Sequence, residues 1–275
     1  MAKIPNFVHN TDIGQNFLVD YSVIDYIIKK ADIKPTDKIL EIGPGEGVLT
    51  EALLASPCQA LCTVELDTRL KCNLEQLALK NPKLTTLWGD AVQYDYASKM
   101  PWQPNRIIAN LPYHITTPLL WMLIEKLVPR GLSSMLLMVQ LESAERITSP
   151  VCNKQRSPLG VTIEAMGSSK ILRRVDPSCF RPQPRVMSCL IEINIDKDRN
   201  FATDKKWKQL LVRSFAQRRK TLSNNWNSGF GIEKPRAQEI LASLGLKPLA
   251  RAEELSLDNW KQLLKISDFD LREKQ

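Results

Sequence analysis

The chain has 275 residues, of which 43% are hydrophobic, and it carries a formal net charge of +8. This length allows one domain of ordinary size and a smaller one, and the composition excludes a mainly disordered chain. No apolar run approaches the ~20 residues that span a bilayer. The start of the chain lacks the apolar segment of a signal peptide, so we expect a cytoplasmic protein without membrane contact.

The six cysteines and two histidines argue against a metal site. The cysteines form no CxxC pair, and His9 and His114 do not cluster with them. Structural zinc usually needs four closely organised ligands. We therefore expect reduced core thiols and no bound metal.

Short apolar runs alternate with helix-like segments through residue 150. The runs that look like strands are residues 37–43, 60–67, 83–91, 105–110 and 133–140. Runs of this length separated by helices predict a parallel sheet that is buried on both faces. Residues 170–175 and 188–195 look like a closing pair of strands. The pattern predicts a Rossmann-like, doubly wound α/β domain, whose ligands bind beyond the carboxyl ends of the strands.

After residue 198 the pattern is helical only. We expect helices within residues 205–226, 235–245 and 256–267. We place a boundary near residue 198, which gives a Rossmann-like domain of residues 1–198 and a small all-α domain of residues 199–275.

The charge is unevenly placed along the chain. Residues 1–150 hold 14 Lys/Arg and 16 Asp/Glu, whereas residues 151–275 hold 24 Lys/Arg and 14 Asp/Glu. The formal net charges of the two parts are therefore −2 and +10. A concentration of cations favours binding to a nucleic acid, and a solvated basic surface is the alternative interpretation.

Three consecutive strand ends carry residues that suit a nucleoside. Gly43 and Gly45 follow the first strand in "EIGPGEG", and glycine lets the backbone turn sharply and approach a ligand. Glu65 ends the second strand, where an acid can accept hydrogen bonds from both ribose hydroxyls. Asp90, after the third strand, can accept from an adenine amine. The glycines lack the Lys of a phosphate-binding loop, so we expect S-adenosyl-L-methionine as the cofactor.

The fourth strand ends in Asn110-Leu111-Pro112-Tyr113, and here the chain resembles a known family. The ordered motifs are "GQNFL" (14–18), "EIGPGEGVLT" (41–50), "VELD" (64–67), "GDA" (89–91), "NLPYHITTPLL" (110–120) and "FRPQPRV" (180–186). Together they closely resemble the ribosomal RNA adenine N6-dimethyltransferases. This superfamily contains the KsgA type, which acts on small-subunit rRNA, and the Erm type, which acts on large-subunit rRNA. Residues 214–226 and 250–264 resemble the helical domain of the KsgA type.

The resemblance implies a role for each motif residue. The cofactor would be bound by Asn16, Leu18, Gly43, Gly45, Glu65, Asp90 and Asn110. Tyr113 and Phe180 would hold the target adenine between them. RNA phosphates would contact a basic cluster consisting of Arg213, Arg218, Arg219 and Lys220, for which a solvated helix face is the alternative.

The chemistry of the transfer calls for alignment more than for a base. The adenine amine is a poor nucleophile because its lone pair is delocalised, whereas a sulfonium is an excellent methyl donor. The Asn110 side-chain oxygen and the Leu111 carbonyl can accept from the amine and turn its lone pair towards the methyl group. Pro112 biases Leu111 away from helical geometry. We therefore expect no role as a general base for His114.

The resemblance implies N6,N6-dimethylation of two adjacent adenosines in the 3′-terminal hairpin of small-subunit (16S) rRNA. The partner would be an assembling small ribosomal subunit, and we expect a monomeric enzyme. An Erm-type enzyme acting on 23S rRNA and a non-catalytic RNA-binding assembly factor are the alternatives. Leu141, where the family usually has Lys, and Met187, where it tends to have Asp, depart from the pattern and affect the expected RNA contacts.

Overall fold

The computed structural model describes residues 15–196 and 198–269, so Gly14 of "GQNFL" and His9 lie outside the described residues. The chain divides into two compact units. The first unit consists of residues 1–144 and 168–196, and the second of residues 145–167 and 197–275. No helix within the described ranges is both long and apolar enough to cross a membrane.

The first unit is built around a sheet that, within the described residues, has seven strands in the order β4-β3-β2-β5-β6-β9-β7. Its strands are β2 (Lys38–Ile42), β3 (Ala60–Glu65), β4 (Leu84–Trp88), β5 (Arg106–Asn110), β6 (Ser134–Gln140), β7 (Gly167–Val175) and β9 (Ser188–Ile195). Strands β2 to β6 pair in parallel, and β9 runs antiparallel to β6. The predicted strands and the predicted α/β fold class are confirmed.

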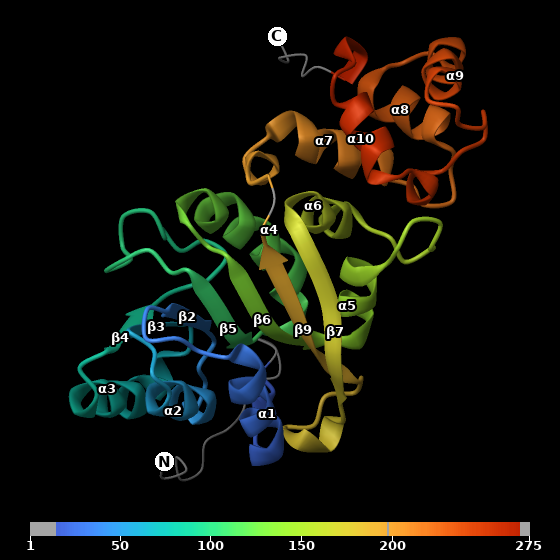
Figure 1. Ribbon diagram of the computed structural model, residues 1–275. Coiled ribbons are helices and arrows are strands. Elements are labelled where there is room, and N and C mark those ends of the chain that lie inside the picture. Colours follow the sequence, from blue (N-terminus) through green and yellow to red (C-terminus); the bar gives the residue numbers. More distant parts are fainter. Residues whose placement is uncertain (1–14, 197, 270–275) are drawn as a thin grey trace. The chain divides into compact units, whose positions relative to one another are not determined.

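Helices cover both faces of this sheet. The helices of the first unit include α1 (Tyr21–Ala31), α2 (Val48–Ala55), α3 (Lys71–Lys80) and α4 (Thr116–Leu127). Figure 1 shows α1, α2 and α3 gathered together, and the apolar side chains of α1 and α2 share one core with Ile39, Leu61 and Ile108 of the sheet. Because β5 and β6 extend the sheet away from β3 and β4, a right-handed crossover places α4 on the other face.

The second unit contains the helices α6 (Pro158–Met166), α7 (Lys205–Ser214), α8 (Leu222–Phe230), α9 (Lys234–Ser243) and α10 (Leu257–Leu263). Its core holds three fully buried tryptophans, Trp207, Trp226 and Trp260. Val161 and Ala165 of α6 belong to the same core, and Trp207 Nε1 donates to Thr162 Oγ1 at 3.1 Å. Residues 145–167 therefore group with the helical unit, although the boundary expected at residue 198 left them in the first domain. Helix α5 (Leu141–Thr148) carries the chain from one unit to the other.

The helical segment expected within residues 205–226 is divided into two helices. The chain leaves the helix after Ser214 and re-enters it at Leu222. Asn225 stabilises the break, because its Nδ2 donates to the carbonyls of Ser214 and Gln217, at 2.8 and 3.2 Å, and its Oδ1 accepts from the N–H of Gln217. An asparagine that binds backbone groups in this way competes with helix formation.

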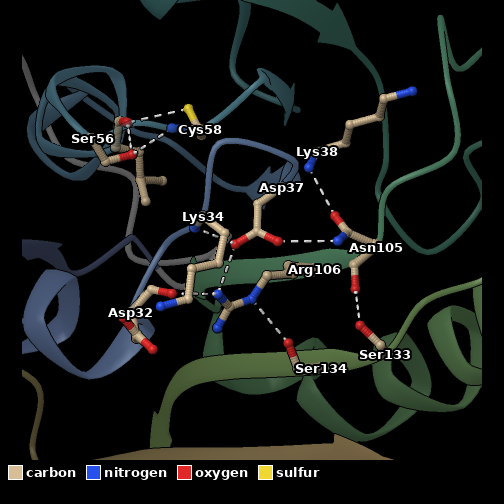
Figure 2. Close-up of polar contacts among 11 residues, drawn as sticks. Asp32, Lys34, Asp37, Lys38, Ser56, Cys58, Asn105, Arg106, Ser133 and Ser134 are labelled. Atoms are coloured by element: carbon tan, nitrogen blue, oxygen red, sulfur yellow. Dashed lines mark hydrogen bonds and ion pairs between the residues drawn. The ribbon is translucent and has the colours of Figure 1, made fainter.

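The amino ends of the strands are joined by a network around the buried carboxylate of Asp37 (Figure 2). Asp37 Oδ2 accepts from the backbone N–H of Lys34 at 2.8 Å and from Arg106 Nη1 at 2.9 Å, and its Oδ1 accepts from Asn105 Nδ2 at 3.1 Å. Arg106 Nε also donates to Ser134 Oγ at 3.0 Å, which connects β5 to β6. Burial opposes ionisation of Asp37, but these donors outweigh it and hold its pKa below the ordinary value.

We predict that Asp37→Asn lowers the free energy of unfolding by about 2–3 kcal/mol at pH 7, because hydrogen bonds to a charged group each contribute about 1.5–3 kcal/mol. A carboxylate with a depressed pKa contributes stability above its ordinary pKa of about 4 and loses it as the pH falls through the lower folded value. Urea unfolding should therefore show the gap between variant and parent closing in acid. A gap that is independent of pH would contradict the assigned ionisation.

Candidate active site

The carboxyl ends of β2, β3, β4 and β5 meet at one edge of the sheet, because these strands are parallel neighbours. A cavity of about 800 Å³, partly open to solvent, lies at this edge. Seven of the residues predicted from the sequence line it, namely Asn16, Gly43, Glu65, Asp90, Asn110, Leu111 and Pro112. The sheet thus brings together residues from five separate motifs.

The glycine turn after β2 has the backbone that its sequence predicts. Gly43 and Gly45 have φ angles of +67° and +58°, which other residues rarely adopt. The N–H of Gly45 donates to Glu65 Oε2 at 3.1 Å, and a Cβ on Gly45 would lie 2.7 Å from the Phe17 ring. Gly43 lines the cavity, whereas Gly45 supports its wall from behind.

Glu65 is buried, yet its carboxylate retains capacity to bind a ligand. Its Oε1 accepts from the N–H groups of Leu66 and Asp67, both at 2.8 Å, and its Oε2 accepts from Gly45. Burial raises the pKa of this carboxyl in spite of these donors. A carboxylate offers about four acceptor sites, so Oε2 can accept one further donor, such as a hydroxyl in the cavity.

Asp90 follows β4 and is half-buried at the cavity wall. Its Oδ1 accepts from the N–H of Val92 at 2.8 Å, which fixes the carboxyl group in a local turn. The adjacent Gly89 donates its N–H to the carbonyl of Glu65 at 2.8 Å, which keeps the two acidic residues on neighbouring strand ends.

The N-terminal segment forms a wall of the cavity because three sets of contacts hold it. Gln15 Nε2 donates to Asp67 Oδ2 at 2.7 Å, and the carbonyl of Asn16 accepts from Asn110 Nδ2 at 2.8 Å. Strand β1 (Phe17–Leu18) pairs antiparallel with β8 (Phe180–Arg181). Leu18 itself is 5% exposed and belongs to the hydrophobic core, so it anchors the segment and is not among the residues that line the cavity.

Asn110 presents an acceptor that no described residue satisfies. Its Nδ2 is occupied by the carbonyl of Asn16, while its Oδ1 is buried and accepts no hydrogen bond from the described part of the chain. Leaving a buried acceptor without a donor costs about 1–3 kcal/mol. A ligand that brings an N–H to this oxygen would recover that cost.

A second cavity lies beside the first and shares Gln15 and Asn16 with it. It has a volume of about 770 Å³, part of which is open to solvent, and is also lined by Tyr113, Gln140 and residues 182–186. The hydroxyls of Tyr113 and Ser188 form a hydrogen bond, and burial raises the pKa of Tyr113. Tyr113 therefore stays neutral, and its half-buried ring forms part of the cavity wall.

Phe180 does not lie where the sequence interpretation put it. Its side chain is 2% exposed and packs in the core, and its backbone pairs with Leu18 across β1 and β8. Phe180 is absent from the residues that line either cavity. Of the two aromatic residues expected to hold the target adenine, Tyr113 lines a cavity and Phe180 does not.

The basic cluster of the second unit lies on the turn between α7 and α8. Arg218, Arg219 and Lys220 are exposed there. Arg213 differs, because its Nη1 donates to the carbonyl of Gly229 at 2.8 Å and its guanidinium lies 5.0 Å from the centre of the Phe230 ring. The expected cluster thus consists of three exposed cations and one arginine that packs against Phe230.

Two residues at this edge were missed in the sequence analysis. Gln140 ends β6 and lines the second cavity, and Ser188 begins β9 directly opposite it. The pairing of a parallel strand with a later antiparallel one is a long-range feature, so no local signal in "MVQLE" or "VMSCL" marked either residue.

The chain is similar to known proteins over most of its length. The family model described as ribosomal RNA adenine dimethylase matches residues 6–268. A protein of Geobacter metallireducens named ribosomal RNA small subunit methyltransferase A is 36% identical over 258 residues, which are 91% of this chain and 92% of that protein.

Two solved structures are similar over most of the chain. A dimethyladenosine transferase from Plasmodium falciparum has a TM-score of 0.75 and 25% identity, with 90% of this chain and 95% of the other covered. The 23S rRNA methyltransferase ErmE has a TM-score of 0.66 and 21% identity, with 91% and 98% covered, and this likeness supports the fold alone. On its motifs, its fold and its family match, the chain belongs to the ribosomal RNA adenine dimethylase family.

Proposed function

We propose that this enzyme transfers methyl groups from S-adenosylmethionine to the N6 amine of adenosine in small-subunit rRNA. Two adjacent adenosines in the 3′-terminal hairpin of 16S rRNA are the proposed targets, and each receives two methyl groups. The observation that carries the proposal is the unsatisfied Oδ1 of Asn110, a residue that lines the first cavity and is bonded through its Nδ2 to Asn16, a residue of both cavities. The name of the Geobacter metallireducens relative favours the small subunit over the large one.

Asn110 orients the amine in this proposal. Its Nδ2 is held by Asn16, so its Oδ1 has a fixed direction and accepts one amine hydrogen. The Leu111 carbonyl accepts the other, and together they turn the nitrogen lone pair towards the methyl donor. Holding reactants close and in line can supply about 7–11 kcal/mol of barrier reduction in favourable cases. His114 is exposed and no step requires it as a base.

The residues of the first cavity fit S-adenosylmethionine. Glu65 has acceptor capacity for a ribose hydroxyl, Asp90 can accept from the adenine amine of the cofactor, and Gly43 lets the backbone approach the methionine portion. Asn16 and Gln15 close the side that faces the second cavity. When bound, the cofactor supplies an electrophilic methyl group on a sulfonium centre.

The second cavity suits an adenine that has left its helix. Enzymes that modify a base must take it out of the stack, and stacking on an aromatic ring returns about 1–3 kcal/mol per base. Tyr113 offers such a ring, and its hydrogen bond to Ser188 fixes the ring orientation. Arg218, Arg219 and Lys220 are proposed to contact RNA phosphates of an assembling small subunit.

The direct test is methylation of small subunits isolated from a strain that lacks these methyl groups. Labelled cofactor and primer extension on both rRNAs would map the product. Paired stops in the 3′-terminal hairpin of 16S rRNA support the proposal, whereas stops in 23S rRNA alone would reassign the enzyme to the large subunit.

We predict that Asn110→Ala lowers kcat by about 100-fold or more, in line with the loss of one preorganised electrostatic contact in a water-excluded site. The affinity for S-adenosylmethionine, measured by calorimetry, should change little, because the other contacts of the cofactor remain. Asn110→Asp serves as the matched variant, since it keeps an acceptor for the amine, although it replaces the donor to Asn16 by a second acceptor and adds a negative charge. Near-normal turnover of Asn110→Ala would remove Asn110 from the mechanism.

We predict that cofactor affinity falls as the pH is lowered, and that Glu65→Gln weakens binding and flattens this dependence. Ribose hydroxyls donate to the ionised carboxyl, so binding lowers a pKa that burial has raised and releases protons. Affinity must then rise with pH until the free carboxyl is fully ionised. Calorimetric titrations over a pH series measure both effects, and parallel pH profiles for the two proteins would argue against the contact.

We predict that replacing Arg218, Arg219 and Lys220 by alanine lowers kcat/KM on small subunits and reduces the salt dependence of subunit binding. Each phosphate contact that is lost should reduce the slope of log affinity against log salt by about 1. Alanine at Lys234, Lys247 and Lys265, exposed cations of the same unit, is the matched control for net charge. Equal effects of the two triple variants would show that overall charge matters and the turn does not.

A further inference from the structure

Gln140 lines the second cavity, and the proposed mechanism assigns no role to it. It is the last residue of β6, and its Cα partner across the β6–β9 pair is Ser188. Side chains of directly opposed residues lie on the same face of a sheet. Gln140 therefore lies on the same face as Ser188, whose hydroxyl is bonded to Tyr113.

The same face carries the rest of the second cavity. Met138 and Leu136, which alternate with Gln140 along β6, belong to the core cluster that includes Leu18 and Phe180. The segments next to those two residues supply Asn16 and the loop 182–186 to the cavity. Gln140 thus stands on a strand of the central sheet, whereas Gln183 and Arg185 stand on an exposed loop.

The amide of Gln140 has unused hydrogen-bonding groups. Its side chain is half-buried, and within residues 15–196 and 198–269 no hydrogen bond is formed to it. The Tyr113 and Ser188 hydroxyls, in contrast, bond to one another. An amide NH₂ group that stands at the end of a sheet strand and lines a cavity is suited to donate a hydrogen bond to an acceptor on a ligand.

The target adenine presents such acceptors beside its amine. In the proposed mechanism, both amine hydrogens donate to Asn110 and Leu111. A further residue that recognises the base must therefore form hydrogen bonds with the ring nitrogens. N1 and N7 flank the amine, and both are acceptors that call for a donor. Glutamine amides commonly pair with the N6/N7 edge of adenine in nucleic acid recognition.

We propose that Gln140 donates a hydrogen bond to a ring nitrogen next to the amine of the target adenine, either N1 or N7, and so positions and selects this base. The inference rests on the proposed function, because it assigns the second cavity to adenine. Gln140 orients the base, while Asn110 orients the amine on it.

The test combines protein variants with altered substrates. Small subunits are reconstituted with a 3′ rRNA fragment that carries adenosine, 7-deazaadenosine or 1-deazaadenosine at the target positions. One analogue should lower kcat/KM of the parent enzyme by about 3- to 10-fold, the usual effect of one lost hydrogen bond. Gln140→Ala should show this loss on ordinary adenosine and no further loss on that analogue. Gln76→Ala, an exposed glutamine on α3, should behave like the parent enzyme.

A second variant separates donation from simple packing. Gln140→Glu keeps the size of the side chain but turns a carboxylate towards the ring nitrogen, so its kcat/KM should fall below that of Gln140→Ala. Cofactor affinity should be unchanged in both variants. The inference is overturned if both analogues lower the kcat/KM of Gln140→Ala by the same factor as that of the parent enzyme. It is also overturned if neither analogue lowers the kcat/KM of the parent enzyme. A parent enzyme that does not methylate ordinary adenosine would instead overturn the proposed function itself.

Discussion

The hydrogen bond from Asn110 Nδ2 to the carbonyl of Asn16 fixes the orientation of the Asn110 amide and, with the Gln15–Asp67 bond and the β1–β8 pair, holds the N-terminal segment in the site. It joins residues 94 positions apart and ties the N-terminal segment to the end of a central strand. The segment then becomes a wall of both cavities, since Gln15 and Asn16 line each of them. The same bond uses the donor of the Asn110 amide and leaves its acceptor unsatisfied, so one interaction both shapes the site and decides which atom faces the ligand.

The buried carboxyl groups at the two ends of the strands differ in their pKa values, and we assign Asp37 at the amino ends to stability and Glu65 at the carboxyl ends to ligand binding. At the amino ends, Asp37 has a donor for each of its oxygens, and its pKa is lowered. At the carboxyl ends, Glu65 also has three donors, but all are neutral backbone N–H groups, so burial prevails and raises its pKa. Glu41, one strand over, is buried and accepts from Thr50 Oγ1 at 2.7 Å, and burial raises its pKa to about 8. Of these two raised carboxyl groups, Glu65 lines the first cavity, where the proposed nucleoside can supply a further donor, whereas Glu41 lines neither cavity.

The sequence predicts the features that a local pattern determines. It does not predict those that depend on contacts between segments far apart in the chain. The apolar runs gave all the main strands, and the positions of Glu65 and Asn110 at strand ends followed from them. Phe180 was misplaced, because its two-residue pairing with Leu18 leaves no periodic signal in a loop rich in proline. The break after Ser214 depends on the side chain of Asn225, eleven residues further on, which no helix pattern reveals. Gln140 and Ser188 are adjacent only in the folded sheet.

The antiparallel strand β9 explains how the second cavity can exist beside the first. In a sheet of parallel strands alone, β9 would begin at the amino edge, where Asp37 and Arg106 lie. Because β9 runs against β6, its first residue, Ser188, lies opposite the last residue of β6, at the ligand-binding edge. The loop 182–186 arrives at that edge with it and closes the cavity around Tyr113. The parallel part of the sheet therefore forms the pocket proposed for the cofactor, and the antiparallel strand β9 adds the pocket proposed for the base.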